Sequence, residues 1–344
     1  MSATSQRPRR AEPSVPPEQG RVAGRPPWPE WVPGAGLVAA AVLLLRPDLK
    51  PLWDTGAAKT WLTVFVSVVV QAIPFLTLGV VVSAALAVLV PADLLARLVP
   101  RRAGVAVPLA GAAGALLLGC ECGSVPIAGR LLARGVPAGV ALAFLLSAPA
   151  INPVVLVATA VAFPGQPEMV VARLLASLAV SVLTGLLWTR LGRLPGWLPR
   201  VAARRAAAGD GPRWAALATA AREDFIQAGG FLVVGSLTSA TLNVTLPRGF
   251  LTGLGGQGVL SVAVLGLFAV LLAICSEADA FIAASFTAFS PTARLAFMVV
   301  GPAIDVKLFA LQVGVFGRSF AVRFAPVVLA VALLASLGVG AVLL

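Results

Sequence analysis

The sequence predicts an all-α integral membrane protein that contains two homologous repeats. Of its 344 residues, 59% are hydrophobic and only 12% are charged, whereas about 25% of the residues of an average soluble domain are charged. Several charge-free stretches exceed the ~20 residues that a helix needs to cross a ~30 Å hydrocarbon core. All the charge-free stretches considered, long and short, are 60–92, 103–120, 135–167, 174–189, 225–247, 249–276 and 324–344.

The repeat is visible as sequence that recurs at a nearly constant spacing. Residues 71–86 match residues 227–242 at eight of sixteen positions, at an offset of 156 residues. At an offset of 153 residues, Cys122 corresponds to Cys275, and a Phe…Pro-Ala-Ile motif follows each cysteine. Membrane proteins built from two similar halves usually enclose a substrate path between them. The repeat therefore predicts a transporter.

The two repeats divide the chain into five parts. Residues 1–33 are rich in proline and arginine, which is typical of a disordered tail and here of a basic cytoplasmic one. Residues 34–59 hold a short first membrane span and its loop. Residues 60–189 form membrane repeat 1, and residues 223–344 form membrane repeat 2. The arginine-rich residues 190–222 form a cytoplasmic linker between them.

The positive-inside tendency orients the repeats. If both Cys-bearing segments crossed the membrane, Lys and Arg would divide almost evenly between its two sides. If each segment instead enters and returns on the same side, most basic residues, the linker and the N-terminus lie in the cytoplasm. The charge distribution favours this re-entrant arrangement, which inverts repeat 2 relative to repeat 1. It leaves Lys307 as the one basic residue expected inside the membrane.

Two kinds of helix break are expected within the membrane. The Cys-bearing segments 120–126 and 275–281 contain glycine, proline or clustered carboxylates, and such breaks are tolerated only where they line a cavity or are buried in protein. The second kind follows Pro149 and Pro302, at Asn152 and Asp305. Unwound helices of this sort expose backbone groups toward a ligand. The alternative is a kink that only shapes the packing of the helices.

The thiols of Cys120, Cys122 and Cys275 form a candidate metal or metalloid site. The chain contains no histidine and no tyrosine. A bound metal or metalloid must therefore be held by sulfur, carboxylate or backbone oxygen. Thiolates select soft species such as Cu(I), Zn(II) or trivalent arsenic over hard cations. The alternative is that these cysteines are small apolar packing residues.

Ionisable residues inside the apolar stretches are the other candidates. Because a charge is costly in hydrocarbon, such residues usually face a cavity and a partner. Asp305 and Lys307 are predicted to form an internal pair, whereas Glu277 and Asp279 are predicted to bind substrate or carry a coupling proton. A purely structural ion pair is the alternative. The net charge of +12 does not indicate nucleic-acid binding, because the arginines cluster between apolar stretches as juxtamembrane charges do.

Three motifs resemble those of the predicted-permease family that includes the bacterial organoarsenical efflux permeases. They are Cys120-x-Cys122-Gly123-x-x-Pro126, Phe144…Pro149-x-x-Asn152-Pro153 and Cys275-Ser276-x-x-Asp279-Ala280-Phe281-Ile282-Ala283-x-Ser285-Phe286. The resemblance covers residues 60–344 and implies a multi-pass permease of the bacterial cytoplasmic membrane that exports a small toxic solute. By position, it implies functional roles for Cys120, Cys122, Cys275, Asn152 and Asp279. Glu121 departs from the small polar residues that are common between these cysteines, which favours a cationic metal.

Together these observations predict a permease that exports a soft metal or metalloid species, of the arsenical, copper or zinc type, by alternating access between the repeats. The predicted substrate-binding residues are Cys120, Cys122, Cys275, Asn152, Glu277, Asp279 and Asp305. No cofactor is expected, and no phosphate-binding Gly-x-x-x-x-Gly-Lys-Ser/Thr motif occurs, so an ion gradient or a separate ATPase must supply energy. The alternatives are a non-transporting partner or assembly subunit and, less favoured, an intramembrane enzyme that uses Asp279 and Asp305.

Overall fold

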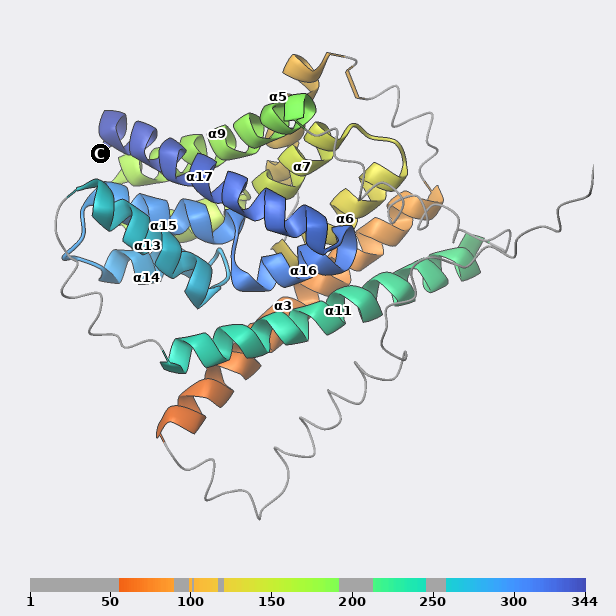
Figure 1. Ribbon diagram of the computed structural model, residues 1–344, viewed down its shortest axis with the longest axis horizontal. Coiled ribbons are helices and arrows are strands. Elements are labelled where there is room, and N and C mark those ends of the chain that lie inside the picture. Colours follow the sequence, from red (N-terminus) through yellow and green to blue (C-terminus); the bar gives the residue numbers. More distant parts are fainter. Residues whose placement is uncertain (1–55, 90–98, 101, 117–120, 192–212, 246–257) are drawn as a thin grey trace, which may run out of the picture.

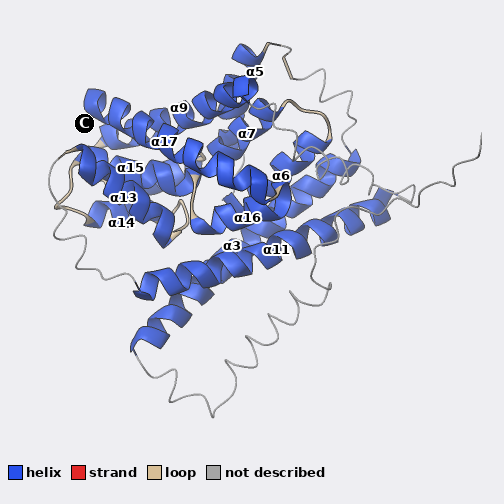
Figure 2. Cartoon of the chain, in the orientation of Figure 1, coloured by secondary structure: helices blue, strands red, loops and turns tan. Residues whose placement is uncertain are grey.

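The computed structural model describes residues 56–89, 99–100, 102–116, 121–191, 213–245 and 258–344 (Figure 1). All the regular elements in these ranges are helices, with no strand among them (Figure 2). The predicted tail 1–33, nearly all of the predicted first span 34–59 and the thiol of Cys120 lie outside the described residues.

Four helical segments in the described part of the chain are long and apolar enough to cross a membrane: Ala58–Leu86, Pro167–Arg190, Pro291–Phe316 and Arg318–Leu343. The chain is therefore an all-helical, multi-pass membrane protein. The long helices that carry or accompany these spans are α3 (Gly56–Leu89), α9 (Pro167–Leu191), α11 (Arg213–Thr245) and α17 (Arg318–Leu343).

Shorter helices lie between the long ones, in the same order in both halves. In the first half they are α5 (Ala103–Ala113), the 3-10 turn η2 (Gly114–Leu116), α6 (Glu121–Ala133), α7 (Ala138–Ser147) and α8 (Pro153–Ala162). In the second half they are α13 (Val259–Leu272), α14 (Asp279–Ser285), α15 (Pro291–Ala303) and α16 (Val306–Phe316). Helices α15 and α16 begin 153 residues after α7 and α8, which is the spacing at which the cysteines recur.

Two long helices begin before the predicted repeat boundaries at residues 60 and 223. Helix α3 begins at Gly56, and α11 begins at Arg213, inside the predicted linker. Five of the first nine residues after Arg213 are alanine, which is the strongest helix former, and no glycine or proline interrupts them. The helix therefore begins twelve residues before the apolar stretch that starts at residue 225.

The helix breaks predicted at Asn152 and Asp305 are present. Asn152 Oδ1 accepts a hydrogen bond of 2.9 Å from the backbone N–H of Val155, at the start of α8. Asp305 Oδ1 accepts one of 2.5 Å from the N–H of Leu308, at the start of α16. Both side chains are therefore N-caps, which satisfy backbone donors that the break would otherwise leave unpaired.

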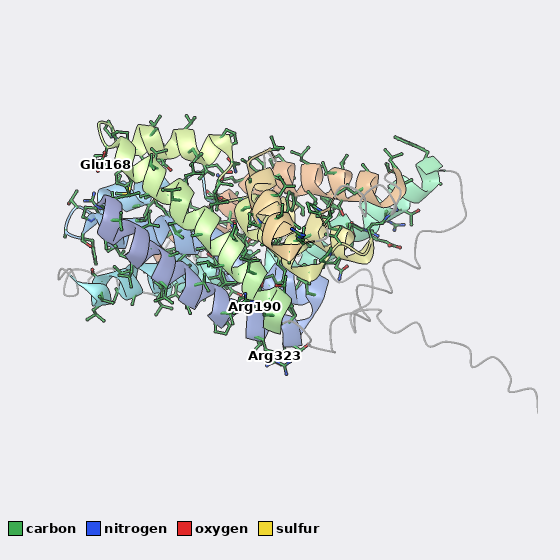
Figure 3. The ribbon with its side chains drawn as sticks, turned by 90° about the horizontal axis from the view of Figure 1, so that it is seen from above. Glu168, Arg190 and Arg323 are labelled. Atoms are coloured by element: carbon green, nitrogen blue, oxygen red, sulfur yellow. The ribbon has the colours of Figure 1, made fainter. Side chains whose placement is uncertain are left out.

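The corresponding long helices of the two halves lie side by side and run in opposite directions. Figure 1 shows α3 and α11 crossing the molecule antiparallel to each other, and α9 antiparallel to α17. Figure 3 places Arg190, at the end of α9, near the same end of this pair as Arg323 of α17, with Glu168 at the other end. Trp188 of α9 packs edge-on against the rings of Phe320 and Phe324, at centroid distances of 5.3 Å in both cases.

Candidate functional site

A fully buried ammonium group lies at the centre of the candidate site. Lys307, in the first turn of α16, places Nζ 2.5 Å from Oε1 of Glu121, the first residue of α6. The same Nζ lies 3.8 Å from Asp305 Oδ2 and 3.8 Å from Cys275 Sγ. The predicted Asp305–Lys307 pair is therefore present, but Glu121 of the first half is the nearer partner of the lysine.

A second buried ion pair lies between α9 and α14. Arg173 donates from Nη2 to Oδ2 of Asp279 at 2.8 Å and to the carbonyl oxygen of Ser276 at 3.1 Å. Its Nη1 donates to Thr159 Oγ1 of α8 at 2.8 Å. Arg173 was not among the basic residues predicted to lie inside the membrane, yet its side chain is 0% exposed within the protein. Three acceptors compensate for the loss of its hydration.

Ser276 joins the two ion pairs. Its Oγ lies 3.4 Å from Glu121 Oε2, while its carbonyl oxygen accepts the bond from Arg173. The turn that carries Ser276 separates α13 from α14 and begins at Ala273, whose φ of 48° places it in the left-handed region. Because this turn replaces a helical turn, a backbone carbonyl points toward Arg173 instead of being bonded within a helix.

Both described thiols belong to this region. Cys122 is the second residue of α6 and Cys275 precedes Ser276, and both side chains are buried. Cys275 contacts Lys307 through its sulfur. Among the described residues, no three His, Cys, Asp or Glu side chains form a group that could hold a metal ion. A site that includes Cys120 stays a prediction.

The other predicted residues lie at the edges of this network. Asn152 is buried and, besides capping α8, donates from Nδ2 to the carbonyl oxygen of Ala148 at 3.5 Å. Glu277 is half-buried, and its Oε2 has no hydrogen-bond partner within the part of the chain that the structure describes. Asp279 and Asp305 each face a basic side chain and not one another. This arrangement gives no support to a carboxylate dyad of the aspartyl-enzyme type, in which two carboxyls share a proton.

A third buried ion pair, which the sequence did not predict, anchors α6. Arg130 donates from Nε to Asp224 Oδ2 at 3.1 Å and from Nη2 to Asp224 Oδ1 at 3.1 Å. Ser83 of α3 donates to the same Asp224 Oδ2 at 2.8 Å. Arg130 is only 5% exposed. The pair holds α6, and with it Glu121 and Cys122, against the α3–α11 pair.

Comparison with known proteins identifies the family. A family model described as "Predicted permease" matches residues 57–340. The chain belongs to this family. The match covers nearly all the described helices, so the network around Lys307 and Arg173 lies within the permease region. No solved structure matches the permease.

Two curated relatives are similar over most of the permease. The "UPF0718 protein YcgR" of Bacillus subtilis is 32% identical over 279 residues, which cover 80% of this chain and 95% of the relative. A Streptococcus mutans protein named "Putative two-component membrane permease complex subunit" is 32% identical over 272 residues, which cover 76% of this chain and 89% of the relative.

Proposed function

We propose that this permease exports a small soft cation or metalloid species, of the arsenical, copper or zinc type, out of the bacterial cytoplasm. The observation that carries the proposal is the position of Lys307. Its ammonium is enclosed by two carboxylates and a thiol that come from both halves of the chain. Buried ionisable groups are costly in a membrane and usually mark the path of a substrate or coupling ion.

The two halves act as inverted repeats in this proposal. The matching order of helices, the recurring spacing of 153 residues between helix starts and the antiparallel α3–α11 and α9–α17 pairs support it. Transporters with this architecture bind substrate between their repeats near the middle of the membrane, and rock one repeat against the other. The basic end of the α9–α17 pair, with Arg190 and Arg323, then faces the cytoplasm, as does the N-terminus.

The charge of the site favours a cationic substrate. Among the described residues its carboxylates are Glu121, Glu277, Asp279 and Asp305 and its basic groups are Arg173 and Lys307, so the site carries excess negative charge when all of them are ionised. In the empty permease, Lys307 neutralises Glu121. An entering soft cation replaces the ammonium at Glu121 and Cys275, while Lys307 keeps Asp305 as its partner. Cys120 and Cys122 would complete the soft ligand set only after the halves move, because the described side chains form no group of three ligands as they stand.

Transport by purified protein tests this proposal. Proteoliposomes that contain the permease should accumulate Cu(I), Zn(II) or a trivalent arsenical when an ion gradient is applied. Replacing Cys122 and Cys275 by serine removes the soft ligands with little change in size, so flux should fall sharply while protein yield is retained. Glu168→Gln, an exposed change at the start of α9, serves as the control. Normal flux in variants of all three cysteines would exclude thiol ligation, and absence of flux for every probe would contradict the export function.

A second candidate is a subunit of a two-component permease, which the name of the Streptococcus mutans relative favours. In that case the purified chain alone carries no flux, and flux appears when a second membrane protein is co-purified with it. Affinity purification of the tagged chain in mild detergent, followed by mass spectrometry, distinguishes the two candidates.

A further inference from the structure

One face of α9 is polar along most of its length. Arg173, Ser177, Thr184 and Trp188 fall within an arc of about 60° at 100° per residue, and all four are at most 5% exposed. Ser181, which is also buried, lies beside them. We call these five residues the polar face of α9. It extends about 22 Å, at 1.5 Å per residue over fifteen residues, from the Arg173–Asp279 pair almost to Arg190.

Four polar atoms on this face have no hydrogen-bond partner among the described residues. They are Arg173 Nε, Ser177 Oγ, Thr184 Oγ1 and Trp188 Nε1. A buried donor or acceptor that is left unpaired costs free energy comparable to a lost hydrogen bond. Buried polar groups of this kind are normally satisfied by ordered water when protein groups do not reach them. Four such atoms along one helix are therefore places where ordered water could supply the missing hydrogen bonds.

The matching helix of the second half lacks this feature. Helix α17 buries Phe320, Phe324, Val328, Ala332 and Ser336 along its inner face, and its one hydroxyl there, Ser336 Oγ, donates to the carbonyl oxygen of Ala332 at 2.7 Å. The two helices have the same place in their halves and similar lengths. The polar face is therefore not a general requirement for packing a long helix at this place.

We propose that the polar face of α9 lines a water-filled path that connects the Arg173–Asp279 pair with the end of α9 that carries Arg190. The direction of the path rests on the proposed function, which places Arg190 on the cytoplasmic side. The path therefore opens to the cytoplasm. Hydroxyl groups and water can both donate and accept a proton, whereas the Trp188 N–H only donates. Trp188 lies at the Arg190 end of the path. Its ring packs on Phe320 and Phe324 there, which makes this the narrow end. When Asp279 is protonated, its O–H can lose the proton to this water, and the carboxylate then pairs again with Arg173.

Accessibility of single cysteines tests the path without measuring any solute. The full-length chain is prepared with its three native cysteines replaced by alanine, and cysteine is introduced by Ser177→Cys or Thr184→Cys. Val328→Cys and Ala332→Cys on α17 are the matched dry controls, and Arg190→Cys is the exposed control. The probe is a small, membrane-impermeant cationic methanethiosulfonate, added to vesicles from the Arg190 side or from the opposite side.

Cysteines at positions 177 and 184 should react from the Arg190 side about tenfold faster, or more, than those on α17. A thiol in a dry apolar site has a raised pKa, and each unit of increase in pKa lowers the fraction of reactive thiolate about tenfold. Trp188→Ala should increase the rate at Ser177→Cys severalfold, whereas Trp188→Phe, which keeps the ring, should not. Rates at Ser177 and Thr184 as low as those on α17, with normal labelling of Arg190→Cys, would overturn the path. An unchanged rate in a Trp188→Ala variant that still labels normally at Arg190 would overturn its route past Trp188.

Discussion

Arg173 and Asp279 form an ion pair of 2.8 Å across 106 residues of sequence, with side-chain exposures of 0% and 3%. The pair connects a long helix of the first half with the short helix α14 of the second half. A basic group this deeply buried depends on its acceptors for stability, so the carboxylate of Asp279 serves the fold as well as the site.

Asp279→Asn is therefore expected to lower both transport and stability. Removing one partner of a buried ion pair costs roughly 3–5 kcal/mol, whereas replacing both by apolar residues is often nearly neutral. The double variant Arg173→Met/Asp279→Leu should regain most of the melting temperature in detergent, and its flux should stay as low as that of the single variant. A single Asp279→Asn variant as stable as the wild type would show that the pair contributes nothing to the fold.

The Glu121–Lys307 pair gives a second prediction. Glu121→Gln leaves Lys307 with Asp305 at 3.8 Å as its remaining carboxylate, so stability should fall. Lys307→Met should also lower stability, but the double variant should be more stable than the sum of the two losses predicts. The coupling free energy from this double-mutant cycle should be about 1–3 kcal/mol, measured by chemical or thermal unfolding in detergent. A coupling near zero would mean that the two groups do not interact in the folded protein.

The contact between α3 and α6 gives a third prediction. A Cβ atom on Gly79 would overlap the backbone of Gly123, because the two helices touch through their glycines. Gly79→Ala should thus destabilise the protein by about 1–3 kcal/mol through overpacking. Gly338→Ala in α17 is the matched control, since nothing lies within 4 Å of that position, and it should be neutral or stabilising by up to about 1 kcal/mol. Equal melting temperatures for both variants would contradict the close packing.

Labelling from each side of the membrane tests the orientation. With native cysteines removed, Arg190→Cys and Arg323→Cys should react with an impermeant reagent only from the cytoplasm, because both lie at the same end of the α9–α17 pair. Glu168→Cys should react only from outside. All three side chains are exposed, so each variant should be labelled from one side. Labelling of Arg190→Cys and Arg323→Cys from opposite sides would contradict the antiparallel arrangement.

Much of the fold could be predicted from local sequence. Long apolar stretches predict the long helices, and proline with Asn152 or Asp305 predicts the two helix breaks, because a capping side chain acts on a backbone N–H three residues away. The starts of α3 and α11 were less predictable. Alanine favours a helix both inside and outside the membrane. An alanine-rich segment therefore does not show where a membrane span ends and where its helix continues beyond the membrane.

The site was less predictable than the helices. Thiols and carboxylates could be selected as candidates because they are rare inside apolar stretches, but their partners depend on contacts between distant segments. Arg173 lies six residues after the start of α9, where an arginine could equally reach the membrane interface. Its burial follows from Asp279 and Thr159, which the sequence does not place beside it. The same holds for Arg130, whose partner Asp224 lies 94 residues away.

The separation of Arg173 from Asp279 has a consequence for biogenesis. The side chain of Asn152 can accept its hydrogen bond from Val155 as soon as the start of α8 has been synthesised. The break between α7 and α8 therefore needs no partner from the second half. Arg173 must wait for a carboxylate that follows 106 residues later, which is roughly 5–20 s at a synthesis rate of 5–20 residues per second. During that interval α9 carries an arginine without its carboxylate. The stabilisation that Asp279 gives to Arg173 is therefore available only once the second half has been inserted beside the first.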